Sequence, residues 1–414
     1  MNMEALGDFD YTSDEWSDIW GYVDEEGNEY AISGTEDSIY FIDVTDCANP
    51  QVIYQYNGNS PIWRDFKVYE DYAYSVCDGS GCTEGLRIFD LSALPTGGIT
   101  FAGAKTTWFT RAHNIFIDEE NGRLYACDVY DSGVKRDLVI LDIATDPKNP
   151  ILLYEGSLGG GYLHDLNVKD NIIYGSYFYG DDFRIYDAND PNNIFLIEEL
   201  SGMDGAHASW NDADEEWAYL IEEKSDHTIN VIDMANLDDP NNDIEIVNQI
   251  WDPLESDNGL IAHNLFVLND FLYMSHYEDG VKVYDITDRE NPVIAGYNDI
   301  YTQNNNNYTG FEGTWGIYPF FPSGCIVASD ITNGVNTMQL DWEIADTCTP
   351  VVNIESPVVG GLYSASNHLI TKVETDQTSP TILQGVLSVE LLPGFEATRL
   401  QDFEAKIEEC VPNN

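Results

Sequence analysis

Basic side chains are scarce in this chain. Its 414 residues include 17 Lys and Arg against 74 Asp and Glu, which gives a formal charge of -57. Such a surface repels nucleic acid and anionic lipid head groups, so we expect no nucleic acid partner and no direct membrane insertion. Because salt screens self-repulsion, the charge fits a saline habitat, with divalent cations or basic proteins as partners. The 43% of hydrophobic residues still indicate a globular protein.

Sequence signals of several common protein classes are also missing. No segment has convincing helical periodicity, and none is apolar over the length of a membrane span. The start, Met1-Asn2-Met3-Glu4, is acidic instead of basic and apolar, so we expect a mature chain whose export signal was removed or omitted. The sequence contains no Gly-x-Ser-x-Gly, Gly-x-x-x-x-Gly-Lys or His-Glu-x-x-His motif, which argues against the enzyme classes built on them.

Seven cysteines are too few for a disulfide scaffold, and none lies in a Cys-x-x-Cys zinc pattern. Cys77 and Cys82 flank the short flexible sequence Asp-Gly-Ser-Gly, so we predict a disulfide between them. We also predict that Cys348 pairs with Cys410. Three cysteines remain, and at least one of them must stay unpaired within the chain: Cys47, Cys127 and Cys325. Disulfides favour an extracellular or cell-surface location over a cytoplasmic one.

What the chain does contain is one phrase that returns every roughly 45 to 55 residues. It is an apolar run that ends in Asp, found at Ile39–Asp43, Leu86–Asp90, Leu138–Asp142, Phe183–Asp187, Ile229–Asp233 and Val281–Asp285. Two further strand-like runs precede each phrase, and another follows it. Four short strands per repeat predict a propeller blade in preference to a helical solenoid or a sandwich. The terminal Asp is explained by side-chain hydrogen bonds that hold the following turn, in preference to metal binding.

The ends of the chain decide the number of blades. Six repeats are complete, and a seventh, Trp315–Leu340, lacks its fourth strand. Residues 3–9 share the pattern of Pro292–Tyr297 and are expected to supply that strand, which would remove two exposed sheet edges. We therefore predict an all-β fold, a seven-bladed β-propeller of four-stranded blades over residues 1–345. A small β module is expected over residues 346–414.

Five further motifs accompany the repeated phrase: Ser17–Tyr22, Trp63–Val68, Ala112–Ile115, Ala262–Leu265 and Trp315–Gly324. Together they resemble the LVIVD-repeat proteins of the choice-of-anchor B family, over about residues 1–342. The resemblance implies a secreted or surface-attached bacterial β-propeller that carries one of several interchangeable C-terminal attachment modules. It implies no particular activity.

The repeats stop near Asp346, where the composition changes. The segments beyond it resemble the coat-hanger stack, a small stacked-strand module of bacterial surface proteins: Asn367–Ile370, Thr381–Gly385, Leu387–Ala397 and Phe403–Ile407. A module of about 65 residues is near the lower size limit for a self-sufficient core, so a disulfide between Cys348 and Cys410 would stabilise it.

One repeat position is rich in histidine. The first strand of each propeller blade lines the central axis, so equivalent side chains there converge at the channel mouth. Aligning the blades at the start of these strands gives Trp20, Arg64, His113, His164, His207, His263 and Trp315. The next position holds Gly21, Asp65, Asn114, Asp165, Ala208, Asn264 and Gly316. Because most of the chain's 7 histidines share one position, we take the channel mouth as the candidate site.

Acidic loops are expected on the same face. The loops between second and third strands carry Asp78, Asp128, Asp131, Asp181, Asp182, Glu222, Glu223, Asp226, His276, Glu278, Asp279 and Asp330. Imidazole nitrogens can hold a transition metal, and carboxylate oxygens can hold calcium. The structural alternative is that each imidazole bonds a backbone carbonyl of the neighbouring blade and so fixes the ring. The sequence leaves packing, metal binding and catalysis open.

Two functions of different class follow. The first is a non-catalytic, secreted or cell-surface scaffold or binding protein, whose propeller presents a face to a protein or glycan partner or to another copy of itself. The second is a secreted metal-dependent hydrolase or lyase with its site at the channel mouth. Aromatic side chains near this face can stack on sugar rings or fill the wedges between blades: Trp63, Tyr162, Tyr177, Tyr179 and Trp315.

Overall fold

The computed structural model describes residues 2–9, 14–58, 61–159, 161–224, 229–235, 237, 244–250, 260–301 and 310–340, and the backbone of six strands between 351 and 407. Its contacts divide the chain into two compact units. One unit comprises residues 5–319 and 326–338, and the other comprises residues 1–4, 320–325 and 339–414. No helix among the described residues is long and apolar enough to cross a membrane.

Seven four-stranded sheets form the blades of a ring. Blade one contains β2 (Trp16–Val23), β3 (Glu29–Thr35), β4 (Ser38–Asp43) and β5 (Gln51–Asn57). Blade two contains β6 (Arg64–Tyr69), β7 (Tyr72–Cys77), β8 (Leu86–Asp90) and β9 (Thr100–Lys105). Blade three contains β10 (Asn114–Asp118), β11 (Arg123–Asp131), β12 (Val134–Asp142) and β13 (Ile151–Gly156). Blade four contains β14 (Leu163–Lys169), β15 (Ile172–Tyr177), β16 (Asp182–Asp187) and β17 (Phe195–Ser201).

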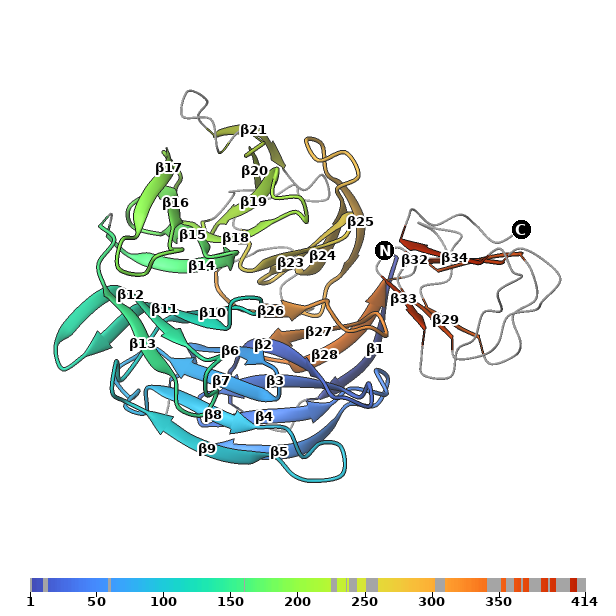
Figure 1. Cartoon of the computed structure of the whole chain (residues 1–414), viewed down its shortest axis with the longest axis horizontal. Helices are drawn as coiled ribbons and strands as arrows, with labels where there is room; N and C mark the ends of the chain where they lie inside the picture. Colours follow the sequence, from blue (N-terminus) through green and yellow to red (C-terminus); the bar gives the residue numbers. More distant parts are fainter. Residues whose placement is uncertain are drawn as a thin grey trace. The chain divides into compact units, whose positions relative to one another are not determined.

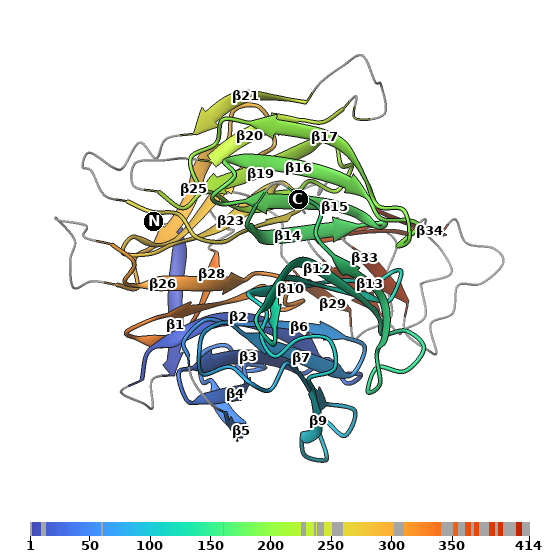
Figure 2. The same ribbon diagram turned by 90° about the vertical axis from the view of Figure 1, so that its left-hand side faces the viewer.

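The remaining blades follow the same plan. Blade five contains β18 (Ala206–Asn211), β19 (Trp217–Glu222), β20 (Ile229–Asp233) and β21 (Glu245–Ile250). Blade six contains β22 (Leu265–Leu268), β23 (Phe271–His276), β24 (Gly280–Asp285) and β25 (Val293–Asn298). Blade seven contains β26 (Thr314–Tyr318), β27 (Cys325–Asp330), β28 (Gly334–Leu340) and, as its outer strand, β1 (Met3–Phe9). The first strands lie nearest the centre of the ring and the fourth strands at its periphery (Figure 1 and Figure 2). The predicted seven-bladed all-β fold is confirmed.

The Asp that ends each third strand holds the turn into the fourth. Asp43 accepts a hydrogen bond from the amide of Thr45, at 3.0 Å, and Asp285 accepts one from Thr287, at 2.8 Å. Equivalent bonds are made in the other complete blades by Asp90, Asp142, Asp187 and Asp233. The predicted turn role of these residues is confirmed. A carboxylate that caps the turn replaces backbone partners that the end of the strand leaves unpaired.

A β-bulge recurs shortly before this Asp. In blades one to six the register between third and fourth strands shifts at one equivalent point, as between Ile140 and Leu141 of blade three. A bulge increases the local twist of a strand. The outer strand of each complete blade is therefore turned away from its inner neighbours, and it is also the most exposed, as the pattern of β5 shows.

The hydrophobic core lies between adjacent blades. Tyr74 and Leu86 of blade two, for example, belong to the same buried cluster as Ile115 and Val139 of blade three. Similar clusters join blade three to blade four and blade five to blade six. Aromatic and β-branched residues suit this wedge, since they bury large areas on a pleated surface. Each blade thus depends on its neighbours for its core, as expected of a repeat protein.

The ring closes at the N-terminal strand, as predicted. In the last sheet β1 lies beside β28, and the hydroxyl of Thr337 on β28 donates to the carbonyl oxygen of Gly7, at 3.2 Å. The same hydroxyl is hydrogen-bonded to the carbonyl oxygen of Cys47 in blade one. A Cβ at Gly7 would lie 2.8 Å from Cδ of Pro50, so glycine permits the close approach of β1 to the Asn-Pro turn of blade one. Strand β1 is therefore clamped from two blades.

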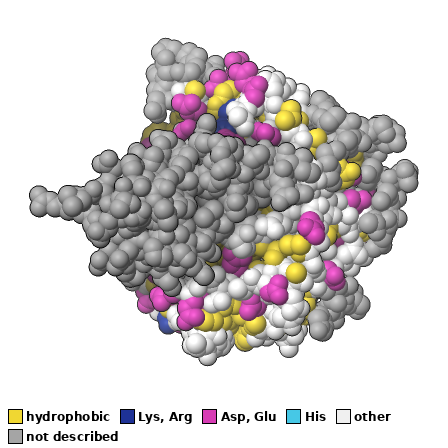
Figure 3. Space-filling model, turned by 90° about the vertical axis from the view of Figure 1, so that its right-hand side faces the viewer, with side chains coloured by type: hydrophobic (Ala, Val, Ile, Leu, Met, Phe, Trp, Pro, Cys, Tyr) yellow, Lys and Arg dark blue, Asp and Glu magenta, His cyan; other side chains and the backbone are white. Residues whose placement is uncertain are grey.

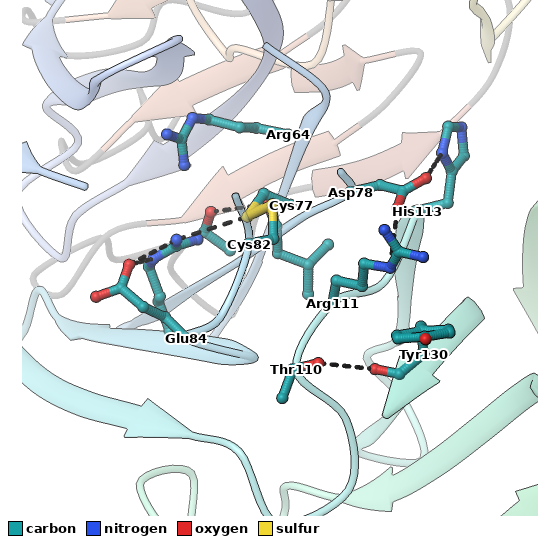
Figure 4. The surroundings of a disulfide bond; sticks show 12 residues. Arg64, Cys77, Asp78, Cys82, Glu84, Thr110, Arg111, His113 and Tyr130 are labelled. Atoms are coloured by element: carbon teal, nitrogen blue, oxygen red, sulfur yellow. Dashed lines mark hydrogen bonds and ion pairs between the residues drawn. A yellow bond between two sulfur atoms is a disulfide. The ribbon is translucent and has the colours of Figure 1, made fainter. Parts of the chain in front are cut away.

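The disulfide between Cys77 and Cys82 is present, with 5.9 Å between the Cα atoms, which confirms that prediction (Figure 4). Cys47 and Cys325 are each disulfide-bonded, whereas Cys127 is a buried free thiol. The side chains of Cys348 and Cys410 lie outside the described residues, so their pairing stays a prediction. On the face shown in Figure 3, acidic side chains are spread over the described surface and basic ones are few.

The strands near the C-terminus form two small parallel sheets. One contains β29 (Val351–Ile354), β31 (His368–Thr371) and β33 (Ser388–Leu391). The other contains β30 (Gly361–Ala365), β32 (Thr381–Gly385) and β34 (Phe403–Ile407). Strands that are successive along the chain alternate between the two sheets. This parallel stacking differs from the antiparallel pairing inside the blades.

Candidate functional site

The first strands begin with a bulge at the channel mouth. In β14 the register to β15 skips His164, in β18 it skips His207, and in β26 it skips Trp315. An extra residue at a strand end re-aims its side chain, which is common beside functional sites. The residue after the bulge is often Asp or Asn, whose Oδ1 accepts the amide of the next residue, as Asp165 does from Leu166 at 2.6 Å.

The same hydrogen bond shows which residue of blade one is equivalent. Asp18 Oδ1 accepts the amide of Ile19, at 2.8 Å, and the register of β2 skips Ser17 and Asp18. Ser17 therefore occupies the position that the sequence alignment gave to Trp20, which lies two residues past Asp18 and deeper in the channel. There Trp20 meets the ring of Tyr318, at 5.2 Å between centroids, and a Cβ at Gly21 would collide with that ring. The placement of Trp20 at the mouth was wrong.

Four imidazoles from four successive blades form a continuous arc, here called the histidine arc: His113, His164, His207 and His263. The ring centroids are 4.3 Å apart between His113 and His164, 4.3 Å between His164 and His207, and 4.5 Å between His207 and His263. The indole of Trp315 continues the arc, at 5.0 Å from His263. The structure thus brings together the histidines that share one repeat position.

One hydrogen bond of the arc has the predicted structural form. Nδ1 of His263 lies 2.6 Å from the carbonyl oxygen of Trp315 in the next blade. The backbones of His207 and His263 act on the preceding imidazoles, His164 and His207, but more weakly. The geometry there falls short of a hydrogen bond, since Nδ1 of His164 and of His207 is buried without a partner. The packing explanation therefore accounts for His263 and not for the whole arc.

The inner members of the arc are neutral. Burial lowers the pKa values of His164 and His207 well below the usual value, and lowers that of His263 to about 3. Neutral imidazole keeps one nitrogen lone pair, which is the form that binds a metal. His113 at the rim differs, because its Nδ1 lies 3.1 Å from Oδ2 of Asp78.

Glu223 faces the arc from blade five. Its amide donates to the carbonyl of Gly205, at 3.0 Å, which places Glu223 beside the start of β18. Its Oε2 lies 3.6 Å from Nε2 of His207, and its Oε1 lies 3.9 Å from Nε2 of His263. The hydroxyl of Tyr277 donates to Oε1, at 2.6 Å. Burial raises the pKa of Glu223 to about 7, although the bond from Tyr277 opposes the shift.

A second layer of charge lies just below the arc. Lys67 Nζ is 2.7 Å from Asp65 Oδ1, and both side chains are buried. Burial and the Asp65 carboxylate raise the pKa of Asp18 well above its usual value, and burial raises that of Asp165 to about 7. Burial lowers the pKa of Lys67, but the nearby carboxylates outweigh it and raise the pKa overall. One ammonium is therefore shared among three carboxyl groups, two of which hold protons tightly.

Aromatic rings fill the channel below this layer. Trp210 packs against Phe116 and Phe266, with centroids 5.7 Å and 4.9 Å apart, and Trp20 packs against Phe266 at 5.8 Å. The cavities left in the channel, one at the arc and one beside the aromatic rings, measure only about 30 Å³ each. A cavity of this size holds about one water molecule. The channel is therefore plugged.

A larger cavity of about 360 Å³ opens beside the arc, here called the mouth cavity. Its lining residues are Trp63, Asp78, Gly79, Arg111, His113, Asp128, Tyr130, Lys135 and Tyr162. The Asp78 carboxylate lies between the imidazole of His113 and the guanidinium of Arg111, with 3.7 Å from Oδ1 to Arg111 Nε (Figure 4). The hydrogen bond from His113 and the charges of both cations outweigh burial and lower the pKa of Asp78. The cavity thus carries fixed charges of both signs.

Two cations of this cavity also sit over aromatic rings. Arg111 Cζ lies 4.2 Å from the centroid of Tyr130, and Lys135 Nζ lies 4.3 Å from that of Tyr162. Lys135 also forms an ion pair with Asp128, at 2.5 Å. Cation–π contacts of this kind are attractive when partly desolvated and hold the long side chains in place. Of the aromatic residues named from the sequence, Trp63 and Tyr179 are exposed, whereas Tyr177 is buried and cannot stack on a ligand.

The predicted channel-mouth residues are mostly neighbours. The cavity at the arc is lined by Arg64, Asp65, His113, Asn114, His164, His207, His263, Asn264 and Trp315, together with Asp18 and Trp63. Asp165 lies one layer deeper, beside Lys67. Asp18 and Lys67 were missed by sequence reasoning. An Asx residue followed by an apolar residue, which recurs at the start of most first strands, would have identified Asp18.

The predicted acidic metal ligands do not assemble into one site. Within the described part of the chain, the one group with metal-ligand spacing is His164, His207 and Glu223. Asp182 pairs with Arg184, at 2.8 Å, and Glu222 accepts the amide of Asp204, at 2.5 Å. Asp330 accepts the amide of Asn333, at 2.7 Å. The others outside this group, Asp78, Asp128, Asp131, Asp181 and His276, are spread over blades two, three, four and six, and Asp226 lies outside the described residues.

Comparison with known proteins supports the fold and goes no further. No family model matches the chain, and no curated protein matches it. The β-propeller domain of Cps50 (Swd1) from Myceliophteria thermophila is similar, with a TM-score of 0.54 and 11% sequence identity, over 82% of this chain and 99% of that one. The WD40 repeats of RRP9 are similar with a TM-score of 0.56 and 9% identity, over 82% and 97%. The chain is thus a β-propeller protein.

Proposed function

We propose that this protein is a non-catalytic binding protein of the cell surface or extracellular space, whose propeller holds a protein partner at the mouth cavity. The observation that carries the proposal is the composition of that cavity and its surroundings. Arg111 and Lys135 are two of only 17 basic residues in the chain, and they stand beside the exposed rings of Trp63 and Tyr179. Arginine and large aromatic residues are the types that dominate protein–protein binding energy.

The shape of the site favours binding over catalysis. The cavity at the histidine arc has room for about one water molecule, so an organic substrate would not reach the imidazoles. The mouth cavity is more than ten times larger, but its charged groups are already paired with one another. Paired, immobile charges give electrostatic complementarity to a partner. The hydrolase or lyase alternative therefore has less support.

The extracellular setting rests on chemistry as well as on resemblance. A disulfide in blade two and a charge of -57 both suit an oxidising, saline environment. We assign the propeller to the LVIVD-repeat proteins of the choice-of-anchor B family on its motifs. In this proposal the segment from residue 346 onward is the attachment module, and its stacked parallel strands fit the coat-hanger resemblance.

The experiment compares retention of the labelled full chain on cell envelopes of the organism that makes it. Replacing both Trp63 and Tyr179 by Ala should weaken retention at least about tenfold, since truncating a hot-spot residue costs upward of roughly 1 to 2 kcal/mol. Phe195→Ala is the matched control, because Phe195 is 51% exposed and Trp63 is 48% exposed. It lies on the outer strand β17 and should bind normally.

Treatment of the envelopes identifies the class of partner. Protease treatment should abolish retention if the partner is a protein, while glycosidase treatment should leave it intact. Loss of retention with glycosidase alone would replace the protein partner by a glycan. Equal retention of the wild type and the Trp63→Ala, Tyr179→Ala variant would refute a binding role for the mouth cavity.

A further inference from the structure

Three side chains of the arc converge as metal ligands do. A ring nitrogen of His164, a ring nitrogen of His207 and a carboxylate oxygen of Glu223 all lie within 4.8 Å of one another. His164 comes from blade four, whereas His207 and Glu223 come from the two inner strands of blade five and the turn beyond them. We propose that these three residues, here called the trio, bind one divalent transition-metal ion of the zinc type. This inference is independent of the proposed partner.

The spacing fits an ion with little movement. Zinc binds imidazole nitrogen and carboxylate oxygen at about 2.0 to 2.2 Å, so tetrahedral ligand atoms stand about 3.3 Å apart. The separation of 3.6 Å between His207 Nε2 and Glu223 Oε2 is already near that value. It is too long for a hydrogen bond. The two groups therefore face each other without bonding, and an ion between them would satisfy both.

Unmet hydrogen-bonding capacity at the trio is a separate observation. His164 and His207 are 8% and 3% exposed, and Nδ1 of each has no hydrogen-bond partner. A buried polar atom without a partner costs about 1 to 3 kcal/mol. Such a cost at two adjacent imidazoles calls for an explanation, and a coordinated ion is one that this geometry accommodates.

Neighbouring groups hold the trio as supporting residues hold metal ligands. Tyr277 donates to Oε1 of Glu223, at 2.6 Å, which leaves Oε2 turned toward His207. His263 is held by the carbonyl of Trp315, at 2.6 Å, so its Nε2 lone pair faces the same carboxylate. Hydrogen bonds from outer partners orient metal ligands and raise their affinity. Tyr277 is a positioning residue in this scheme.

The role of the ion is structural. The cavity of about 30 Å³ at the arc leaves room for one bound water and for no organic substrate. Because the ligands come from two blades, the ion would tie blade four to blade five. The surrounding acidic chain, with its charge of -57, would draw cations toward the mouth. Two imidazoles and one carboxylate select zinc or its first-row neighbours over calcium, which prefers oxygen alone.

The test uses the full chain, stripped with a chelator and titrated with Zn²⁺, with Co²⁺ as a visible spectroscopic probe. We expect one equivalent bound per chain and a higher melting temperature, since an ion that binds only the folded state shifts unfolding by mass action. His207→Gln and Glu223→Gln should each weaken zinc binding at least about 100-fold, and Tyr277→Phe about 10-fold. His276→Gln, a buried histidine outside the trio, should bind as the wild type does.

A wild-type protein that binds no zinc, or two trio variants that bind it as tightly as the wild type, would overturn the proposal. Should the variants fail to fold, X-ray absorption of the zinc-loaded wild type decides. Two imidazole nitrogens in the coordination shell support the trio, and fewer than two overturn it.

Discussion

The carboxylate of Asp65 in blade two accepts a hydrogen bond from the backbone amide of Ile115 in blade three, with 2.7 Å between Oδ2 and the amide nitrogen. Its other oxygen, Oδ1, accepts the amide of Phe66 and pairs with the ammonium of Lys67. One buried side chain thus joins two blades and compensates a buried cation. The charged layer below the histidine arc is part of the ring's construction.

The first prediction concerns this pair. Asp65→Asn should lower the free energy of unfolding by about 1 to 3 kcal/mol, because it removes the strongest partner of a buried ammonium. Asp18 and Asp165 remain near Lys67 and limit the loss. Asp65→Asn combined with Lys67→Met should cost less than the sum of the single changes, as denaturant unfolding can measure. Strict additivity would show that the two side chains do not interact.

The second prediction concerns ring closure. Deletion of residues 3–9 should expose the edge of β28 and lower the melting temperature sharply, because each blade depends on its neighbours. Thr337→Val is the graded control, since it removes only the hydroxyl that bonds Gly7 and Cys47. It should cost about 1 kcal/mol, or roughly 2 to 4 °C. Identical melting of the deletion variant and the full chain would contradict the closure role of β1.

The third prediction concerns the pH dependence of stability. Burial raises the pKa of Asp330 to about 6, from an ordinary value of 3.8. The folded state therefore holds this proton more tightly than the unfolded state does, and the resulting stabilisation is lost as pH rises from about 4 to about 6. Asp330→Asn keeps an oxygen to accept the amides of Thr332 and Asn333 but does not titrate.

Relative to the wild type, the Asp330→Asn variant should gain about 1 to 3 kcal/mol of unfolding free energy between pH 4 and pH 7. Denaturant titrations of both proteins at the two pH values measure this difference. A difference that does not change with pH would mean that Asp330 titrates normally in the folded protein.

The fourth prediction concerns the C-terminal segment. If Cys348 and Cys410 are bonded, a peptide map without reductant should recover them in one linked fragment. Replacing both by Ser should make residues 346–414 more sensitive to protease and leave the propeller folded, because its blades have their own core. The Cys77→Ser, Cys82→Ser variant is the control for general effects of disulfide loss. Two free thiols in protein from its natural source would disprove the pairing.

Much of the fold could be predicted because the repeats carry local chemistry. The Asp at the end of each third strand does the same job six times, so a short-range signal was enough to count blades. Strand β1 was predictable because an incomplete last blade requires an edge partner. Both inferences depend on backbone hydrogen bonding, which sequence patterns report well.

The site was predictable where a repeat position is strict and not where a bulge changes its count. Blade one has Ser17 where the other blades have Arg, His or Trp, and its bulge skips two residues instead of one. The eye therefore settled on Trp20, which belongs to the aromatic layer below. Glu223 appeared among the acidic loop residues, but its place over His207 depends on the path of the chain after β19. Spacing along the sequence does not show that path.

The clamp on β1 also orders events during synthesis. Gly7 and Thr337 are 330 residues apart, so β1 leaves the ribosome long before the strand it must pair with exists. At roughly 5 to 20 residues per second, the delay is on the order of 15 to 65 seconds. Blades one to six can stack in the order they emerge, but an arc of blades keeps an open edge until β28 arrives. A nascent chain halted before Thr337 would thus remain unlocked, and a chaperone or protease could recognise it by that open edge.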